Sequence, residues 1–120
     1  MQARGQALSN VINQDHIADL IEAIGIEDYL EIVKSLTHEV ELQVLALETY
    51  SRGNEIDQVK KTAHRLAGML SQFGAHQVAE SAEKVRQAST DNEVNRLAVS
   101  MAGLCRASMA AVLDLPIGPR

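Results

Sequence analysis

Apolar side chains recur every three or four residues along most of the chain, and this spacing constrains the possible fold more than any other feature. In an α-helix it places the apolar residues on one face, whereas a β-strand requires alternation. Proline, which ends helices, occurs only within the last five residues. Glycine or side chains suited to helix caps interrupt the pattern. The sequence therefore predicts five helices, at about residues 13–24, 27–52, 55–73, 75–88 and from a cap at 89–91 to Val112.

The predicted connections near residues 53, 74 and 90 are short, so successive long helices must run antiparallel. We expect an all-α fold, an antiparallel up-down-up-down four-helix bundle whose extra short N-terminal helix caps one end. A chain of 120 residues suffices for one such domain with a proper core. We predict a loose N-terminus at residues 1–12, a single bundle at 13–113 and an irregular tail at 114–120.

The net charge and the cysteine content narrow the classes of function. The formal net charge is −5, which argues against a nucleic-acid partner, because DNA- and RNA-binding proteins gather Lys and Arg on one face. Cys105 is the only cysteine, so no internal disulfide can form, and this cysteine content is consistent with a protein of the reducing cytosol. The N-terminus lacks an apolar segment of signal-peptide length, and no stretch approaches a membrane span. We therefore expect a soluble, cytoplasmic protein without a membrane partner.

The predicted third helix separates a core face from a face that carries a histidine. Its core stripe consists of Val59, Ala63, Leu66, Leu70 and Phe73. His64 lies on the opposite face, with Gly68 one turn later and Ser71 close by. Glycine within a helix costs about 1 kcal/mol relative to alanine, so Gly68 requires an explanation. We interpret Gly68 as a position that gives another molecule access to His64, because a side chain there would block its approach.

Residues around this histidine follow an order and spacing that form a motif: Ala63, His64, Leu66, Gly68, Phe73, Gly74 and Ala75. The segment resembles the signature of the histidine-containing phosphotransfer domains of multistep two-component phosphorelays. The sequence departs from that signature at Ala67, where the family most often has a lysine.

The resemblance implies that His64 is a phosphoacceptor that shuttles a phosphoryl group between receiver-domain aspartates. The partners would be receiver domains of response regulators or of hybrid histidine kinases, and the chain would be a monomer. It would be a phosphocarrier rather than an enzyme, with no ATP or kinase site. It would need no cofactor of its own, since the receiver domain brings the Mg²⁺.

The absent lysine raises the question of which groups contact the phosphoryl group or the partner. We expect Lys61, one turn before His64, and Arg65 beside it to supply the positive charge, with Arg86 on the next helix as a third candidate. At the position of Arg86 some family members have a glutamine that hydrogen-bonds the imidazole, a bond that arginine cannot accept. With Ala67, Gly68 and Ser71, these three residues complete the predicted phosphoryl- and partner-binding surface.

Other readings of the motif remain open. None of the four histidines is preceded by an acidic residue three positions earlier, and no two are four residues apart, so we predict no metal site. The chain also lacks a nucleophile elbow and a glycine-rich phosphate-binding loop.

One alternative function is a non-catalytic module that binds and sequesters response regulators. Another is a structural helical adaptor in which His64 is incidental.

Overall fold

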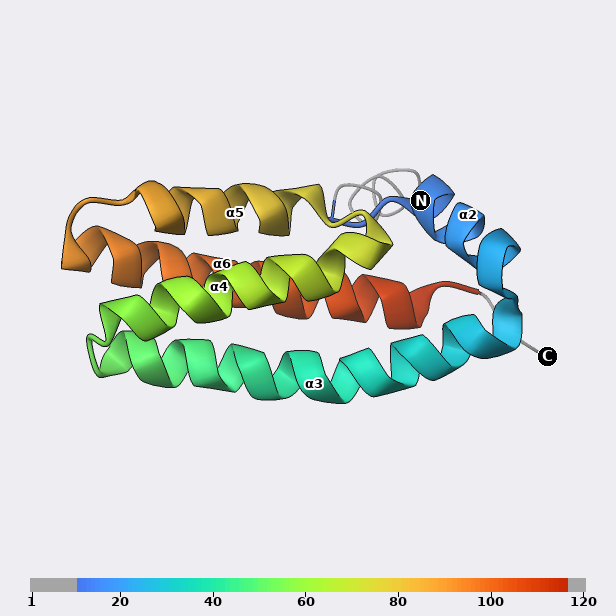
Figure 1. Cartoon of the computed structure of the whole chain (residues 1–120), viewed down its shortest axis with the longest axis horizontal. Coiled ribbons are helices and arrows are strands. Elements are labelled where there is room, and N and C mark those ends of the chain that lie inside the picture. Colours follow the sequence, from blue (N-terminus) through green and yellow to red (C-terminus); the bar gives the residue numbers. More distant parts are fainter. Residues whose placement is uncertain (1–10, 117–120) are drawn as a thin grey trace.

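The computed structural model describes residues 11–116, and every regular element within that range is helical. The long helices run antiparallel in succession, and the predicted all-α class is confirmed (Figure 1). The predicted third helix ends earlier than expected, because its last turn tightens into a 3₁₀ helix. The elements are α2 (Gln14–Ile24), α3 (Ile26–Arg52), α4 (Ile56–Leu70), η1 (Ser71–Phe73), α5 (His76–Gln87) and α6 (Asp91–Asp114).

The four long helices form a bundle in which sequence neighbours are also neighbours in space. Helix α4 packs against α3 on one side and α5 on the other, and α6 closes the bundle between α5 and α3. Helix α4 also contacts α6 across the centre. The short helix α2 contacts α3 and η1 and lies over one end of the bundle, as predicted (Figure 1).

Side-chain caps fix the starts of two helices. The Asn13 side chain accepts a hydrogen bond from the backbone N–H of His16 at 3.0 Å, at the start of α2. The Thr90 hydroxyl accepts one from the N–H of Glu93 at 3.2 Å, at the start of α6. Each cap satisfies a backbone donor that has no partner within the first helical turn. The caps therefore explain why these helices begin where they do.

The core is almost entirely aliphatic, and the stripe predicted for α4 is confirmed, since all five of its residues are buried. Helix α3 contributes an aromatic side chain to this core. Leu30 and Thr37 are only half-buried, whereas Tyr29 is buried and its ring meets Phe73 edge-on, with centroids 6.4 Å apart. An aromatic ring at this end of α3 fills the space beneath η1.

Gly74 joins the bundle to the segment before α2. Its φ of +65° lies in the left-handed region, and a Cβ there would lie 2.4 Å from the Cβ of Asn13. The Asn13 N–H donates to the carbonyl of Phe73 at 2.9 Å. Ile12, which we expected in a loose N-terminus, is therefore part of the core and 1 % exposed. Val11, in the same predicted segment, packs against the core, and residues 1–10 lie outside the described residues.

Helix α6 differs from the expectation that no stretch approaches a membrane span. By length and composition alone, it is apolar enough to cross a membrane. Its apolar residues have a role within the bundle, because many of them are buried against the other helices. The core of the bundle therefore accounts for this composition.

Candidate functional site

His64 projects from the middle of α4 into solvent. Its neighbours Ala63 and Leu66 are buried, so they fix the rotation of the helix and leave position 64 outside. Among residues 11–116, no side chain or backbone group forms a hydrogen bond with the imidazole. Both ring nitrogens are therefore available to an external reactant.

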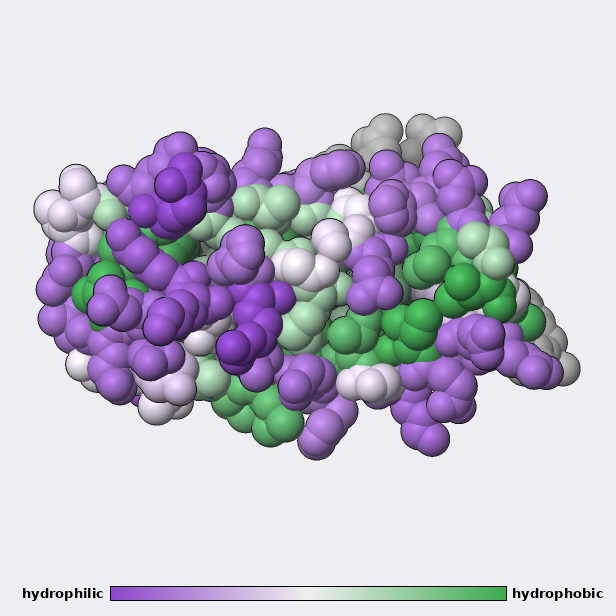
Figure 2. All heavy atoms as spheres, viewed as in Figure 1, coloured by the Kyte–Doolittle hydropathy of each residue, from purple (hydrophilic) through white to green (hydrophobic). Residues whose placement is uncertain are grey.

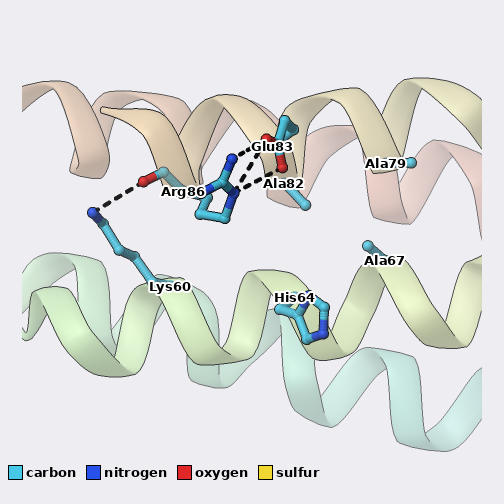
Figure 3. A pocket seen from close by; sticks show the side chains of 7 residues that line it. All are labelled: Lys60, His64, Ala67, Ala79, Ala82, Glu83 and Arg86. Atoms are coloured by element: carbon cyan, nitrogen blue, oxygen red, sulfur yellow. Dashed lines mark hydrogen bonds and ion pairs between the residues drawn. The ribbon is translucent and has the colours of Figure 1, made fainter. Parts of the chain in front are cut away.

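A pocket of about 200 Å³ lies beside His64, between α4 and α5 (Figure 3). Alanine side chains from both helices leave this space, since longer side chains would fill it. One of them is Ala67, the position at which the family signature has a lysine. The pocket is lined by Lys60, His64, Ala67, Ala79, Ala82, Glu83 and Arg86.

Arg86 is paired with a carboxylate of its own helix. Its Nε donates to the two carboxylate oxygens of Glu83 at 2.9 and 3.1 Å, and its Nη2 also contacts Glu83 (Figure 3). The hydrogen bond from Arg86 lowers the pKa of Glu83, and in return Glu83 raises the pKa of Arg86. Both groups are exposed, so the pair contributes little to folding stability.

Lys60 lies on the same side of α4 as the pocket. Its Nζ donates to the carbonyl oxygens of Arg86 at 3.3 Å and Ala88 at 3.4 Å, at the C-terminal end of α5. These carbonyls have no partner within the helix, and a cation there is favourable. Lys60 was not among our predicted site residues, although its position one turn before His64 is visible in the sequence. Glu83 was also missed, and its place one turn before Arg86 could have indicated it.

The two cations that we expected to replace the family lysine do not line the pocket. Arg65 extends toward α3, where its Nη1 donates to the Oε1 of Gln43 at 3.4 Å. Lys61 is exposed and has no partner in the described part of the chain. The structure thus brings only Arg86, of the three predicted cations, to the pocket beside His64.

Gly68 and Ser71 complete the predicted surface on α4. A Cβ added to Gly68 would meet no atom within 4 Å, so nothing inside the molecule requires glycine at this exposed position. The Ser71 hydroxyl donates to the carbonyl of Gly68 at 2.7 Å and thereby satisfies a group at the end of the helix. The surface around Gly68 is therefore open, as the access interpretation requires.

Other reactive groups lie away from this site. No group of three or more His, Cys, Asp or Glu side chains within residues 11–116 could hold a metal ion. Cys105 is buried, and burial raises the pKa of its thiol to about 12. A thiol in this environment is not a nucleophile at neutral pH.

Comparison with protein families identifies the family of this chain. A family model described as Hpt domain matches residues 6–114 of the chain. No curated protein and no solved structure shows a significant match.

Proposed function

The chain belongs to the Hpt domain family, and we propose that it relays a phosphoryl group between receiver-domain aspartates through His64. Hpt domains act in phosphotransfer during two-component signalling and interact with receiver domains. The finer assignment, a carrier in a multistep phosphorelay with His64 as phosphoacceptor, is our proposal. One observation carries it: an exposed imidazole without an internal partner stands one turn from a glycine that the fold does not need.

The proposed reaction requires a neutral imidazole and an accessible ring nitrogen. The lone pair of that nitrogen attacks the phosphorus of an aspartyl phosphate. The N–P bond forms as the O–P bond breaks, and the aspartate carboxylate leaves with the electron pair. The same exchange in reverse delivers the group to the next receiver. Such transfers depend on in-line positioning and on neutralising the equatorial oxygens, for which the receiver domain supplies Mg²⁺.

One face of the bundle carries an apolar area that supports docking of a protein partner (Figure 2). Figure 2 shows hydrophobic residues where α2 and the first half of α3 lie, and mostly hydrophilic residues toward the opposite end of the same face. An apolar area with a polar surround is typical of protein interfaces. We propose that a monomer of this chain docks receiver domains over this face, in the cytoplasm.

A second function has an observation in its favour. The residue at the position of the family lysine is Ala67, and the one arginine that lines the pocket is held by Glu83. A chain that docks receivers but transfers poorly would sequester response regulators without relaying phosphate. No observation favours the third reading, a structural adaptor.

Incubation with a panel of phosphorylated receiver domains tests the proposal. We expect acid-labile, base-stable phosphate on His64 of the wild-type chain and none on His64→Gln, with the melting temperature almost unchanged because position 64 is exposed. His38→Gln, another exposed histidine, is the matched control and should label normally. Binding without label would support the sequestering module. Label on His64→Gln would show that the phosphoacceptor is elsewhere.

A further inference from the structure

Three of the cations near His64 are engaged by another part of the same chain, whereas Lys61 has no partner among the described residues but does not line the pocket. Arg86 is bound by Glu83, Lys60 by the last carbonyls of α5, and Arg65 by Gln43. A phosphoryl group on His64 would therefore not meet free positive charge in the pocket. To bind it, Lys60 or Arg86 would have to leave its present partner.

Arg86 is the cation best placed to change partner. Its side chain lines the same pocket as His64, on the facing helix (Figure 3). It is 66 % exposed, and ion pairs at such positions are weak because solvent screens them. Lys60, in contrast, stabilises the end of α5 through two backbone carbonyls, and its loss would leave them without that donor.

A phosphoryl group is a strong competitor for a guanidinium. It offers three acceptor oxygens and more negative charge than one carboxylate. Arginine binds both groups in the same fork-like geometry, so one can replace the other without strain. Glu83 would still have a donor after the exchange, because Gln87 Nε2 donates to its Oε2 at 3.1 Å.

We propose that Glu83 competes with a phosphoryl group on His64 for Arg86, and that this competition sets how strongly the chain retains the group. The inference rests on the proposed function, since it concerns the phosphorylated form of His64. In the unmodified chain Glu83 holds Arg86. After transfer, Arg86 binds the phosphoryl oxygens, and the carboxylate opposes that contact. Glu83 therefore favours donation of the phosphoryl group to the next receiver.

The equilibrium between a phosphorylated receiver and this chain tests the competition, because an equilibrium distribution does not depend on docking rates. Glu83→Gln should shift the distribution toward phosphohistidine by about twofold to fivefold, the range expected for an exposed ion pair. Arg86→Met, which removes the guanidinium without adding a hydrogen-bonding group, should shift it toward the receiver. In the Arg86→Met background, Glu83→Gln should have no larger effect than the control Glu80→Gln, which removes the same charge from an exposed site one turn away.

A second measurement reports on Arg86 without a receiver. Phosphoramidate transfers its phosphoryl group to imidazole, forming an N–P bond as its own N–P bond breaks and ammonia leaves. In a chain with His16, His38 and His76 replaced by Gln, only His64 accepts the group. The Nε–H NMR resonance of Arg86 should then move on phosphorylation, and move further in Glu83→Gln.

The outcomes separate the two proposals. If neither reagent phosphorylates His64 of the wild-type chain, the proposed function is wrong and the competition falls with it. Two results with a phosphorylated His64 would show that the competition alone is wrong. In one, Glu83→Gln shifts the phosphoryl distribution no more than Glu80→Gln does. In the other, Glu83→Gln causes the same shift whether or not Arg86 is present. An unmoved Arg86 resonance would also overturn it.

Discussion

Gly68 and Gly74 show how one residue type serves different purposes within a few positions of each other. Gly74 has a left-handed backbone, and the Asn13 side chain occupies the space of its missing Cβ. Gly68 has open space around it. Internal packing therefore explains Gly74 but not Gly68, for which we propose the approach of a partner to His64.

This difference leads to a prediction at Gly68. Gly68→Gln should raise the free energy of unfolding by roughly 0.5–1 kcal/mol, because glycine is a poor helix former. The same substitution should slow transfer from a phosphorylated receiver, because the new side chain lies one turn from His64. Urea denaturation and single-turnover transfer rates measure the two effects.

Gly103 provides a matched control for that experiment. It is exposed on α6, and a Cβ there would also meet no atom within 4 Å. Gly103→Gln should stabilise the helix by a similar amount and leave the transfer rate unchanged, because α6 does not line the pocket. If Gly68→Gln transferred as fast as Gly103→Gln, no partner would approach over position 68.

Among the elements of the bundle, the turns between helices form hydrogen bonds to distant parts of the chain. Asn54, in the turn between α3 and α4, has a φ of +54°. Its side chain accepts from Asn95 Nδ2 at 2.8 Å and donates to Asp91 at 3.3 Å, so this turn is bonded to the start of α6. The turn at Gly74 bonds the opposite end of the bundle to the segment before α2.

Substitution at the second of these turns tests its role. Gly74→Ala should destabilise the fold by about 2 kcal/mol or more, because the left-handed backbone is unfavourable for alanine and its Cβ would collide with Asn13. Urea denaturation measures the loss. Gly53→Ala, at the other turn, should cost less, since φ there is −85° and the nearest atom to a new Cβ is a flexible Glu55 oxygen at 3.2 Å. Equal costs would contradict the steric explanation.

For the molecule as a whole, the proposed phosphoacceptor His64 lies on the surface, whereas the interior of the bundle is almost entirely aliphatic. The core contains one thiol, Cys105, which is 0 % exposed. Burial raises its pKa to about 12, so at pH 8 the folded chain holds almost no thiolate. Reaction of this thiol therefore requires that the bundle open.

The labelling of Cys105 should report on global unfolding. At pH 8 we expect an aromatic disulfide reagent to react slowly in the absence of urea, and faster in proportion to the unfolded population as urea increases. The matched control is Ala107→Cys in a Cys105→Ala chain, which places a thiol at an exposed position on the same helix and should react at once. Rapid labelling of Cys105 in the native chain would show that α6 opens locally.

Local sequence patterns were enough to predict the helices and the face of α4 that carries His64. Apolar spacing and glycine breaks are local properties, and a helix of 3.6 residues per turn converts them directly into buried and exposed faces. The same rule identified Gly68 as an exposed glycine next to His64. The family signature then related these residues to phosphotransfer.

The neighbours on each side of His64 could not be predicted from these patterns, because they depend on how the helices pack. The periodicity of α4 places Lys60 and Ala67 on one flank and Arg65 on the other, but it does not say which helix each flank meets. Packing turns the first flank toward α5 and Arg65 toward α3, so Lys60 lines the pocket and Arg65 does not. The Glu83–Arg86 pair is part of the site for the same reason, because it faces His64 only where α5 packs beside α4. The apolar pattern does not determine this arrangement, since bundles of either hand satisfy it.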